Sequence, residues 1–184
     1  IISPLPRIED APAAFDIRDV DGVNYATPNR NQHIPNYCGS CWAFATSSAL
    51  GDRFKMARKA IFPEIFLSPQ YLVNCITGSR GCDGGHHSLV YPYYSKNGGV
   101  DETCQNYQAK NLKCDAEGTC GIFHQKALLP TPNHILSIVG YGHDVSVNKS
   151  YWILRNSWGT YWGENGYGKI QMGNDNLGID GLFG

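Results

Sequence analysis

One short stretch, Asn31–Trp42, combines residue types that could perform acyl-transfer chemistry. Gln32 supplies an amide donor, His33 an imidazole and Cys41 a thiol, all within one short segment. A cysteine attacks or binds as the thiolate, so its chemistry depends on whatever lowers its pKa. The stretch therefore predicts the nucleophile end of a thiol hydrolase, which needs a base from elsewhere in the chain.

The residues after Cys41 indicate how its pKa could be lowered. Residues 42–50 are small or apolar and include no proline, which favours a helix buried on most sides. Cys41 would begin this helix, where unpaired N–H groups and the macrodipole favour a thiolate, and a nearby imidazolium would favour it further. The backbone N–H of Cys41 and the amide of Gln32 could then stabilise a developing oxyanion together.

A candidate base stands at the start of an apolar, β-branched run, Asn133–Gly142. The next segment, Ser150–Gly159, also has strand character, and the two should pair as antiparallel neighbours. Asn156 could then accept the ring N–H of His134 and fix its tautomer, with Trp158 shielding that bond from water. A single histidine is usually just a partly buried polar residue, but the Asn-Ser-Trp-Gly context favours a base.

On these motifs the chain resembles the papain family of cysteine proteases, of which Cys-Gly-Ser-Cys-Trp is a signature. The resemblance runs over residues 11–121 and 133–179. It implies Cys41 as nucleophile, His134 as base, Asn156 as the residue that orients the base, and Gln32 as oxyanion donor. The matching segments are residues 21–26, 31–42, 81–85, 101–110 and 151–163.

An insert of three residues, His33–Pro35, modifies this expectation. In most relatives the glutamine lies closer to the cysteine, and in one branch of the family such an insert forms a loop over the primed side of the cleft. This leaves room for one leaving residue, whose carboxylate His33 could hold, with Tyr37 adding a hydroxyl; Pro35 would stiffen the loop. The resemblance thus implies a carboxypeptidase that removes single C-terminal residues.

The fold class implied is α+β, in the papain-like arrangement of a helical domain and an antiparallel β-barrel domain with the cleft between them. Residues 11–121 would form the helical domain with the nucleophile, and residues 122–184 the β domain with the base. Residues 1–10 look like a propeptide remnant. Ser68 and Pro69 predict a helix start, and Gly84 with Gly85 would let a substrate backbone approach the helical wall.

The chain departs from the family in two places. His134 follows Cys41 at a shorter separation than the ~130–150 residues typical of papain-like enzymes, so barrel strands are missing near residues 122–133 and the sheet should have open edges. Either the protein contains residues that this sequence lacks, which the intact motifs on both sides favour, or it is a shortened relative. Pro92 lies where relatives carry a helix, and the helix should start or kink there.

The cysteine count indicates an oxidising compartment. There are seven cysteines, so one thiol stays free, and the other six allow 15 pairings. The resemblance implies that Cys41 is free and supplies the pairs Cys38–Cys82, Cys75–Cys114 and Cys104–Cys120. Two alternatives are disfavoured, a thioredoxin-like redox pair of Cys38 with Cys41 and a zinc site built from Cys104, Cys114, Cys120 and a histidine.

Composition excludes several other functions. The formal net charge of −1 gives no nucleic-acid footprint, and no apolar run approaches the ~20 residues of a membrane span. We expect no cofactor or metal, and as partners we expect peptides or proteins with a free C-terminus, and protein inhibitors of papain-like proteases. A lysosome or comparable acidic compartment, or secretion, fits the cysteines; Asn148-Lys-Ser is a glycan acceptor. The alternatives are an inactive papain-like binding or structural protein and an endopeptidase.

Overall fold

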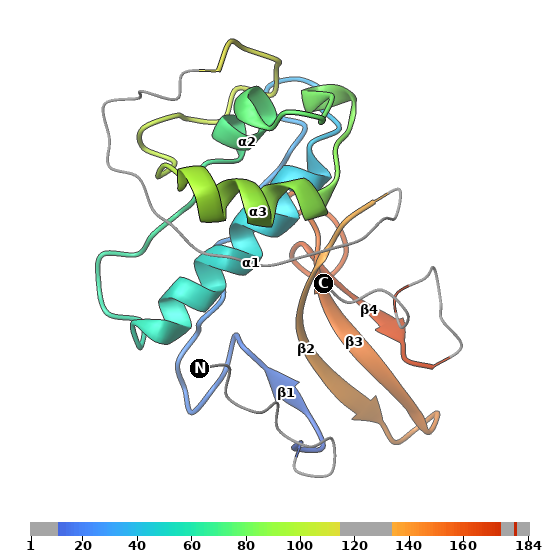
Figure 1. Ribbon diagram of the computed structural model, residues 1–184. Coiled ribbons are helices and arrows are strands. Elements are labelled where there is room, and N and C mark those ends of the chain that lie inside the picture. Colours follow the sequence, from blue (N-terminus) through green and yellow to red (C-terminus); the bar gives the residue numbers. More distant parts are fainter. Residues whose placement is uncertain (1–10, 115–133, 174–178, 180–184) are drawn as a thin grey trace.

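The computed structural model describes residues 11–114, 134–173 and 179. The helices lie together, and an antiparallel sheet lies to one side of the longest helix (Figure 1). This is the α+β arrangement expected from the sequence. The proposed domain boundary at residues 121 and 122 falls outside the described residues and stays a prediction. No helix among the described residues is long and apolar enough to cross a bilayer.

The elements in chain order are β1 (Phe15–Asp16), α1 (Cys41–Ala57), α2 (Pro69–Cys75), the 3-10 turn η2 (Gly81–Asp83), α3 (His87–Asn97), β2 (Ser137–Asp144), β3 (Lys149–Arg155) and β4 (Tyr167–Gln171).

Helix α1 begins at Cys41, as predicted, and is largely buried over its first three turns. Its polar residues can be buried because their hydroxyl groups bond back to the helix itself. The hydroxyl of Thr46 donates to the Trp42 carbonyl at 2.6 Å, and that of Ser47 donates to Phe44 at 3.2 Å. The helix thus places a thiol at its N-terminus while the rest of its length packs in the interior.

The two other helices test the capping predictions. Helix α2 starts at Pro69, and the Ser68 hydroxyl accepts a hydrogen bond from the Tyr71 N–H at 3.1 Å, which confirms the predicted cap. Helix α3 starts at His87 and contains Pro92, so of the two expectations for Pro92 the helix start is wrong, and the kink stays a prediction. Val90, two residues before Pro92, is fully buried. Its burial contributes stability that counteracts the loss of the hydrogen bond that Pro92 cannot donate.

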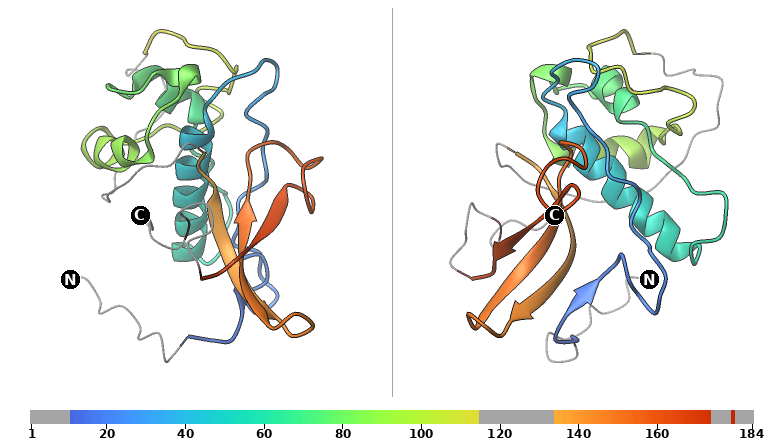
Figure 2. Two further views of the ribbon diagram at one scale, coloured as in Figure 1. Left: turned by 90° about the vertical axis from the view of Figure 1, so that its right-hand side faces the viewer. Right: turned by 180° about the vertical axis from the view of Figure 1, so that it is seen from behind.

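The sheet has the order β1-β2-β3-β4. Strands β2 and β3 pair antiparallel from Ser137 opposite Arg155 to Asp144 opposite Lys149, which confirms the predicted hairpin. Strand β1 pairs with β2 although it lies far upstream in the chain. A strand of only two residues has too short a pattern to be predicted from the sequence. Among the described residues the sheet stays open, with β1 and β4 at its edges, as expected for an incomplete barrel (Figure 2).

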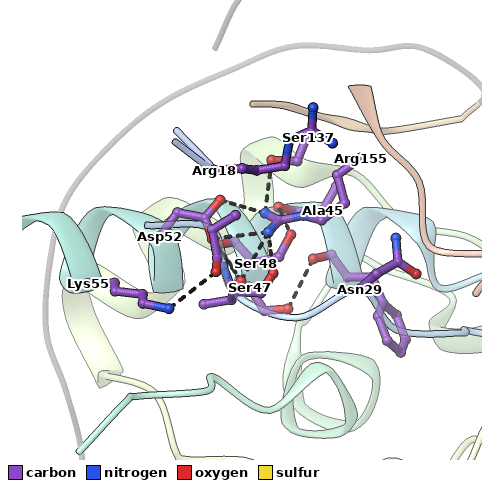
Figure 3. A network of polar contacts seen from close by, with 12 residues as sticks. Arg18, Asn29, Ala45, Ser47, Ser48, Asp52, Lys55, Ser137 and Arg155 are labelled. Carbon is purple, nitrogen blue, oxygen red and sulfur yellow. Dashed lines mark hydrogen bonds and ion pairs between the residues drawn. The ribbon is translucent and has the colours of Figure 1, made fainter. Parts of the chain in front are cut away.

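A buried polar network joins α1 to the sheet (Figure 3). Arg155 at the end of β3 forms an ion pair with Asp52 of α1 at 2.6 Å, and both side chains are almost fully buried, at 3% and 6% exposure. The guanidinium also donates to the Thr27 carbonyl at 2.8 Å and to the Ser137 hydroxyl at 3.2 Å. Asp52 in turn accepts from the backbone N–H and the hydroxyl of Thr27. The network therefore connects the N-terminal segment, α1, β2 and β3.

We predict that Asp52→Ala lowers the free energy of unfolding by about 3–5 kcal/mol, because it leaves the buried Arg155 charge without its counterion. Denaturant unfolding followed by tryptophan fluorescence measures the change. Glu164→Ala is the matched control, since it breaks the exposed Lys169–Glu164 pair and should cost about 1 kcal/mol or less. Equal, small losses in both variants would show that the buried pair does not hold the two parts together.

Candidate active site

An open groove of about 570 Å³ lies between the N-terminus of α1 and the segments around His134 and Trp158. Its lining comes from segments far apart in the sequence, so only folding brings them together. Every sequence-predicted site residue except Asn156 lines the groove, and Asn156 lies behind it, hydrogen-bonded to His134. The lining residues with a predicted role are Gln32, His33, Tyr37, Cys41, Gly84, Gly85, His134 and Trp158.

Cys41, His134 and Asn156 form a connected series. Cys41 is the first residue of α1, His134 lies just before β2, and Asn156 directly follows β3. The Nε2 atom of His134 lies 2.9 Å from Oδ1 of Asn156. Because this oxygen can only accept, Nε2 carries a hydrogen, and the hydrogen bond between His134 and Cys41 falls to the other ring nitrogen, Nδ1. The amide thus fixes the tautomer that a base needs.

The pKa values of the thiol and the imidazole shift in opposite directions. Burial acts to raise the pKa of Cys41, but the hydrogen bond to His134, backbone N–H groups and the imidazolium charge outweigh it, so the thiol pKa is lowered. The pKa of His134 is raised by its hydrogen bond to Cys41 against the effect of burial, with help from Asn156. Both shifts favour a thiolate paired with an imidazolium.

Gln32 is held rigidly at the groove. Its side-chain oxygen accepts a hydrogen bond from the Ser157 hydroxyl at 2.5 Å, and its amide nitrogen donates to the Cys38 carbonyl at 2.9 Å. A side-chain amide nitrogen has two hydrogens, so the second can serve a ligand in the groove. Ser157 was not predicted from the sequence, although its place between Asn156 and Trp158 was a signal that could have identified it.

His33 and Tyr37 stack on each other at one end of the groove. Their ring centroids lie 4.7 Å apart with an interplanar angle of 8°. The Nδ1 atom of His33 accepts the Cys38 N–H at 3.3 Å, so the neutral ring carries its hydrogen on Nε2. Burial and the positive charge of His134 lower the pKa of His33. The structure therefore favours the neutral ring of His33 down to lower pH than for an ordinary histidine.

Trp158 is partly exposed and lies beside both histidines. Its ring centroid is 5.0 Å from that of His134 and 6.5 Å from that of His33. Trp162 meets the same indole edge-on at 6.0 Å. The indole therefore covers one side of His134, the position from which it could protect the bond to Asn156.

Packing and backbone conformation within the protein account for glycine at positions 84 and 85. A side chain at Gly85 would place its Cβ 2.4 Å from the Trp42 ring of α1, whereas one at Gly84 would meet only the Arg80 side chain at 3.5 Å. Gly84 instead has a φ of +112°, which favours glycine. Close packing on Trp42 and a left-handed backbone thus require these residues, and approach of a substrate backbone remains a proposal.

The described residues contain two disulfides, of which Cys38–Cys82 reaches the groove. Cys38–Cys82 joins the segment before α1 to the wall at residues 82–85, and Cys75–Cys114 joins the end of α2 to the following loops. In the third implied pair, Cys104–Cys120, Cys120 lies outside the described residues. Cys41 is the free cysteine of the described part.

These disulfides bear on both disfavoured alternatives. Cys38 is bonded to Cys82 and so forms no redox pair with Cys41. Cys114 is bonded to Cys75, which removes it from the proposed zinc site. Within the residues that the structure describes, no cluster of three or more histidine, cysteine or acidic side chains could hold a metal.

The open sheet, the helix-terminal thiol and the ordered imidazole define a papain-like protein with the geometry of a thiol hydrolase. The model for the "Papain family cysteine protease" family matches residues 11–126 and 119–182. The chain belongs to the papain family of cysteine proteases. It is 36% identical to "Cathepsin Z" of Onchocerca volvulus, covering 89% of this chain and 71% of that protein, and 30% identical to mouse cathepsin K, covering 88% and 61%.

Solved structures agree on the fold. A procathepsin L2 proteinase from the Tenebrio molitor larval midgut superposes with a TM-score of 0.77 at 26% identity, covering 94% of this chain and 67% of that one. The Carica candamarcensis cysteine protease CMS1MS2, solved in complex with E-64, gives a TM-score of 0.75 at 25% identity, covering 91% and 92%. The Onchocerca alignment extends over 219 residues, more than the 184 of this chain. Part of that relative therefore has no counterpart here, in keeping with the open sheet.

We predict that alkylation of Cys41 by iodoacetamide continues at pH values well below the ordinary thiol pKa of about 8.5. His134→Ala removes the hydrogen bond and the charge that lower the pKa, so burial should then dominate and move the inflection of the rate–pH curve upward. His143→Ala is the control, because His143 lies on the exposed part of β2 and bonds Ser150. The ion-pair assignment would be contradicted if the inflection of the rate–pH curve lay at the ordinary thiol pKa and did not move in His134→Ala.

Proposed function

We propose that this chain is a cysteine carboxypeptidase that removes single residues from the free C-terminus of peptides and proteins. The observation that carries the proposal is the stacked His33–Tyr37 pair at one end of the groove that holds Cys41. The match to a cathepsin Z at 36% identity supports the papain-type peptidase class. The single-residue specificity rests on the loop.

In the proposed reaction the Cys41 thiolate attacks the scissile carbonyl carbon and forms a tetrahedral intermediate. The negative oxygen accepts hydrogen bonds from the Cys41 N–H and from the free amide hydrogen of Gln32. The imidazolium of His134 gives its proton to the leaving amine, and the C–N bond breaks to leave a thioester. A water molecule, deprotonated by His134, then hydrolyses the thioester and restores the thiolate.

Recognition of the C-terminus follows from the contacts of His33. In the neutral ring Nδ1 accepts the Cys38 N–H, so Nε2–H is the group that would donate to the substrate carboxylate. Protonation of the ring at Nδ1 gives up the bond to Cys38 and leaves Nε2–H as the donor. The free-enzyme pKa of His33 is lowered, but a bound carboxylate raises it, because an opposite charge favours the protonated ring. Binding of a free acid should therefore strengthen as the pH falls through the His33 pKa, toward a more acidic range than an ordinary histidine would give.

The setting proposed for this activity is a lysosome, a comparable acidic compartment or the extracellular space. Two disulfides in the described residues favour an oxidising compartment. Asn148, the glycan acceptor, is exposed in the turn that joins β2 to β3. Protein inhibitors of papain-like proteases are proposed partners, since they would use the same groove.

Experiments can distinguish the proposed carboxypeptidase from two other functions. An inactive papain-like binding or structural protein would show no preferential reactivity of Cys41. An endopeptidase would cleave peptides whose C-terminus is blocked. The stacking of His33 on Tyr37 and the disulfide of Cys38 beside them support a loop that is held in place at the groove, which argues for the exopeptidase.

We predict that Cys41→Ala reduces peptide hydrolysis to background while the unfolding curve stays close to that of the wild type. The thiol is the only group in the proposed reaction that can form the thioester, so its removal should stop hydrolysis. The free energy of unfolding should change little, because the substitution removes only one sulfur atom at the groove. Mass-spectrometric release of the C-terminal residue measures activity. Wild-type turnover by the purified variant would refute the nucleophile assignment.

We predict that His33→Ala lowers kcat/KM for free-acid substrates by roughly 10- to 150-fold, the equivalent of losing one hydrogen bond to a charged group. The matching C-terminal amide should be affected much less, because it offers no anion, and alkylation of Cys41 should keep its rate. The acidic rise of kcat/KM for free acids should also disappear in the variant. Equal kcat/KM for acid and amide in the wild type would leave the loop as a steric block only.

A further inference from the structure

Tyr107 lies beneath the candidate active site and contacts both of its donor segments. Its hydroxyl donates a hydrogen bond to the backbone carbonyl of Gln32 at 2.7 Å. The same oxygen lies 2.5 Å from the hydroxyl of Ser40, a fully buried residue directly before Cys41. One phenol group therefore bridges the residue proposed as oxyanion donor and the residue that precedes the nucleophile.

The direction of these bonds is determined by proton counting. A phenol has a single hydrogen, and the Gln32 carbonyl can only accept. The hydrogen of Tyr107 therefore points to Gln32, and the Ser40 hydroxyl donates to the phenol oxygen. Removal of this oxygen would leave an acceptor on one segment and a donor on the other without their shared partner.

Tyr107 is itself held from two sides. Its backbone N–H donates to the Glu102 carboxylate at 2.9 Å, and the same carboxylate oxygen pairs with Arg30 at 2.5 Å. Its ring meets Phe44 of α1 edge-on, with the centroids 4.6 Å apart. Burial raises the pKa of the phenol, so the hydroxyl keeps its hydrogen at working pH. The bridge is therefore anchored to α1 and to the segment that leads into Gln32.

The bridge matters because the two proposed oxyanion donors come from different segments. The Cys41 N–H is fixed by the start of α1, whereas the Gln32 side chain is held by Ser157 and Cys38 and its backbone is bonded by Tyr107. Donors must lie within about 2.7–3.1 Å of the oxyanion to stabilise it. A small displacement of the loop relative to α1 would move one donor out of this range.

We propose that Tyr107 is a positioning residue that holds Gln32 and the N-terminus of α1 at the separation required for a two-donor oxyanion site. Tyr107 does not touch the substrate and acts through Gln32. The proposal rests on the proposed peptidase function and adds a residue to its machinery. Nothing in the local sequence around Tyr107 predicts this role, since its partners lie 67 and 75 residues away.

The first test is Tyr107→Phe in the full chain, with a fluorogenic peptide substrate and rates normalised to titrated thiol. The variant should lower kcat by roughly 3- to 10-fold, the effect of one lost hydrogen bond, with KM nearly unchanged. Alkylation of Cys41 by iodoacetamide, which forms no oxyanion, should keep its rate and its pH profile. Tyr93→Phe is the matched control, because it removes a hydroxyl that contacts Tyr71, and kcat should not change.

The decisive test repeats the change in a Gln32→Ala background. Gln32→Ala alone should lower kcat by roughly 10²- to 10³-fold. If Tyr107 acts through Gln32, Tyr107→Phe should have almost no further effect there. An equal factor in both backgrounds, or a parallel loss of alkylation rate, would overturn the proposal. Ser40→Ala gives a second variant that keeps the Tyr107–Gln32 bond, and its smaller loss should show the same dependence on Gln32.

These outcomes are distinct from failure of the proposed function. If Cys41→Ala and Gln32→Ala both leave hydrolysis unchanged, the peptidase assignment itself is wrong, and the positioning role falls with it. If those two variants behave as expected but Tyr107→Phe is additive with Gln32→Ala, only the positioning role is refuted. Affinity for a peptide aldehyde, whose adduct with Cys41 also carries an oxyanion, should fall with Tyr107→Phe in parallel with kcat.

Discussion

The buried ion pair between Asp52 and Arg155 is the interaction on which the site geometry depends. Asp52 belongs to the same helix as Cys41, and Arg155 directly precedes Asn156. A rigid helix transmits the position of one end to the other, so fixing Asp52 against Arg155 also fixes the Cys41 thiol relative to the Asn156 amide, which is hydrogen-bonded to His134. A buried pair is costly to form, but once formed it tolerates little displacement, because any misalignment leaves a charge unsatisfied.

The same network reaches the remaining groups of the site. Ser137, which accepts from Arg155, stands three residues after His134, and Thr27 leads through Asn29 toward Gln32. The Asn29 amide donates to the carbonyls of Asn156 and Gly166, at 2.9 and 3.0 Å, and so ties this segment to the sheet. Buried and partly buried contacts therefore link the four segments that carry Cys41, His134, Asn156 and Gln32, beside an open sheet.

Burial opposes the charged form of both Cys41 and His33, but other interactions outweigh it only at Cys41. At Cys41 it opposes the charged form, but specific hydrogen bonds and a nearby cation outweigh it, so the pKa falls. At His33 burial and the charge of His134 act together, so the neutral ring is favoured until an anion binds. The two histidines, both close to the Trp158 ring, thus differ in protonation. Hydrogen bonds to Cys41 and Asn156 raise the pKa of His134, whereas burial and the charge of His134 lower the pKa of His33.

The sequence by itself determined the chemical groups and the local elements. The start of α1 at Cys41, the Ser68 cap and the β2–β3 hairpin follow from residues within a few positions of one another, because capping and strand pairing across a short turn are local interactions. Only the tertiary structure decided the contacts between distant segments, such as Asp52 with Arg155 and Tyr107 with Gln32.

Contacts between distant segments also decide properties that the local sequence does not indicate. Pro92 alone did not show that α3 already starts at His87, and Gly85 alone does not show that the Trp42 ring leaves no room for a side chain. The lowered pKa of His33 also depends on its neighbour His134, which lies about a hundred residues away in the chain. Packing and electrostatics depend on distance in space, and the spacing of residues along a chain does not specify that distance until the chain has folded.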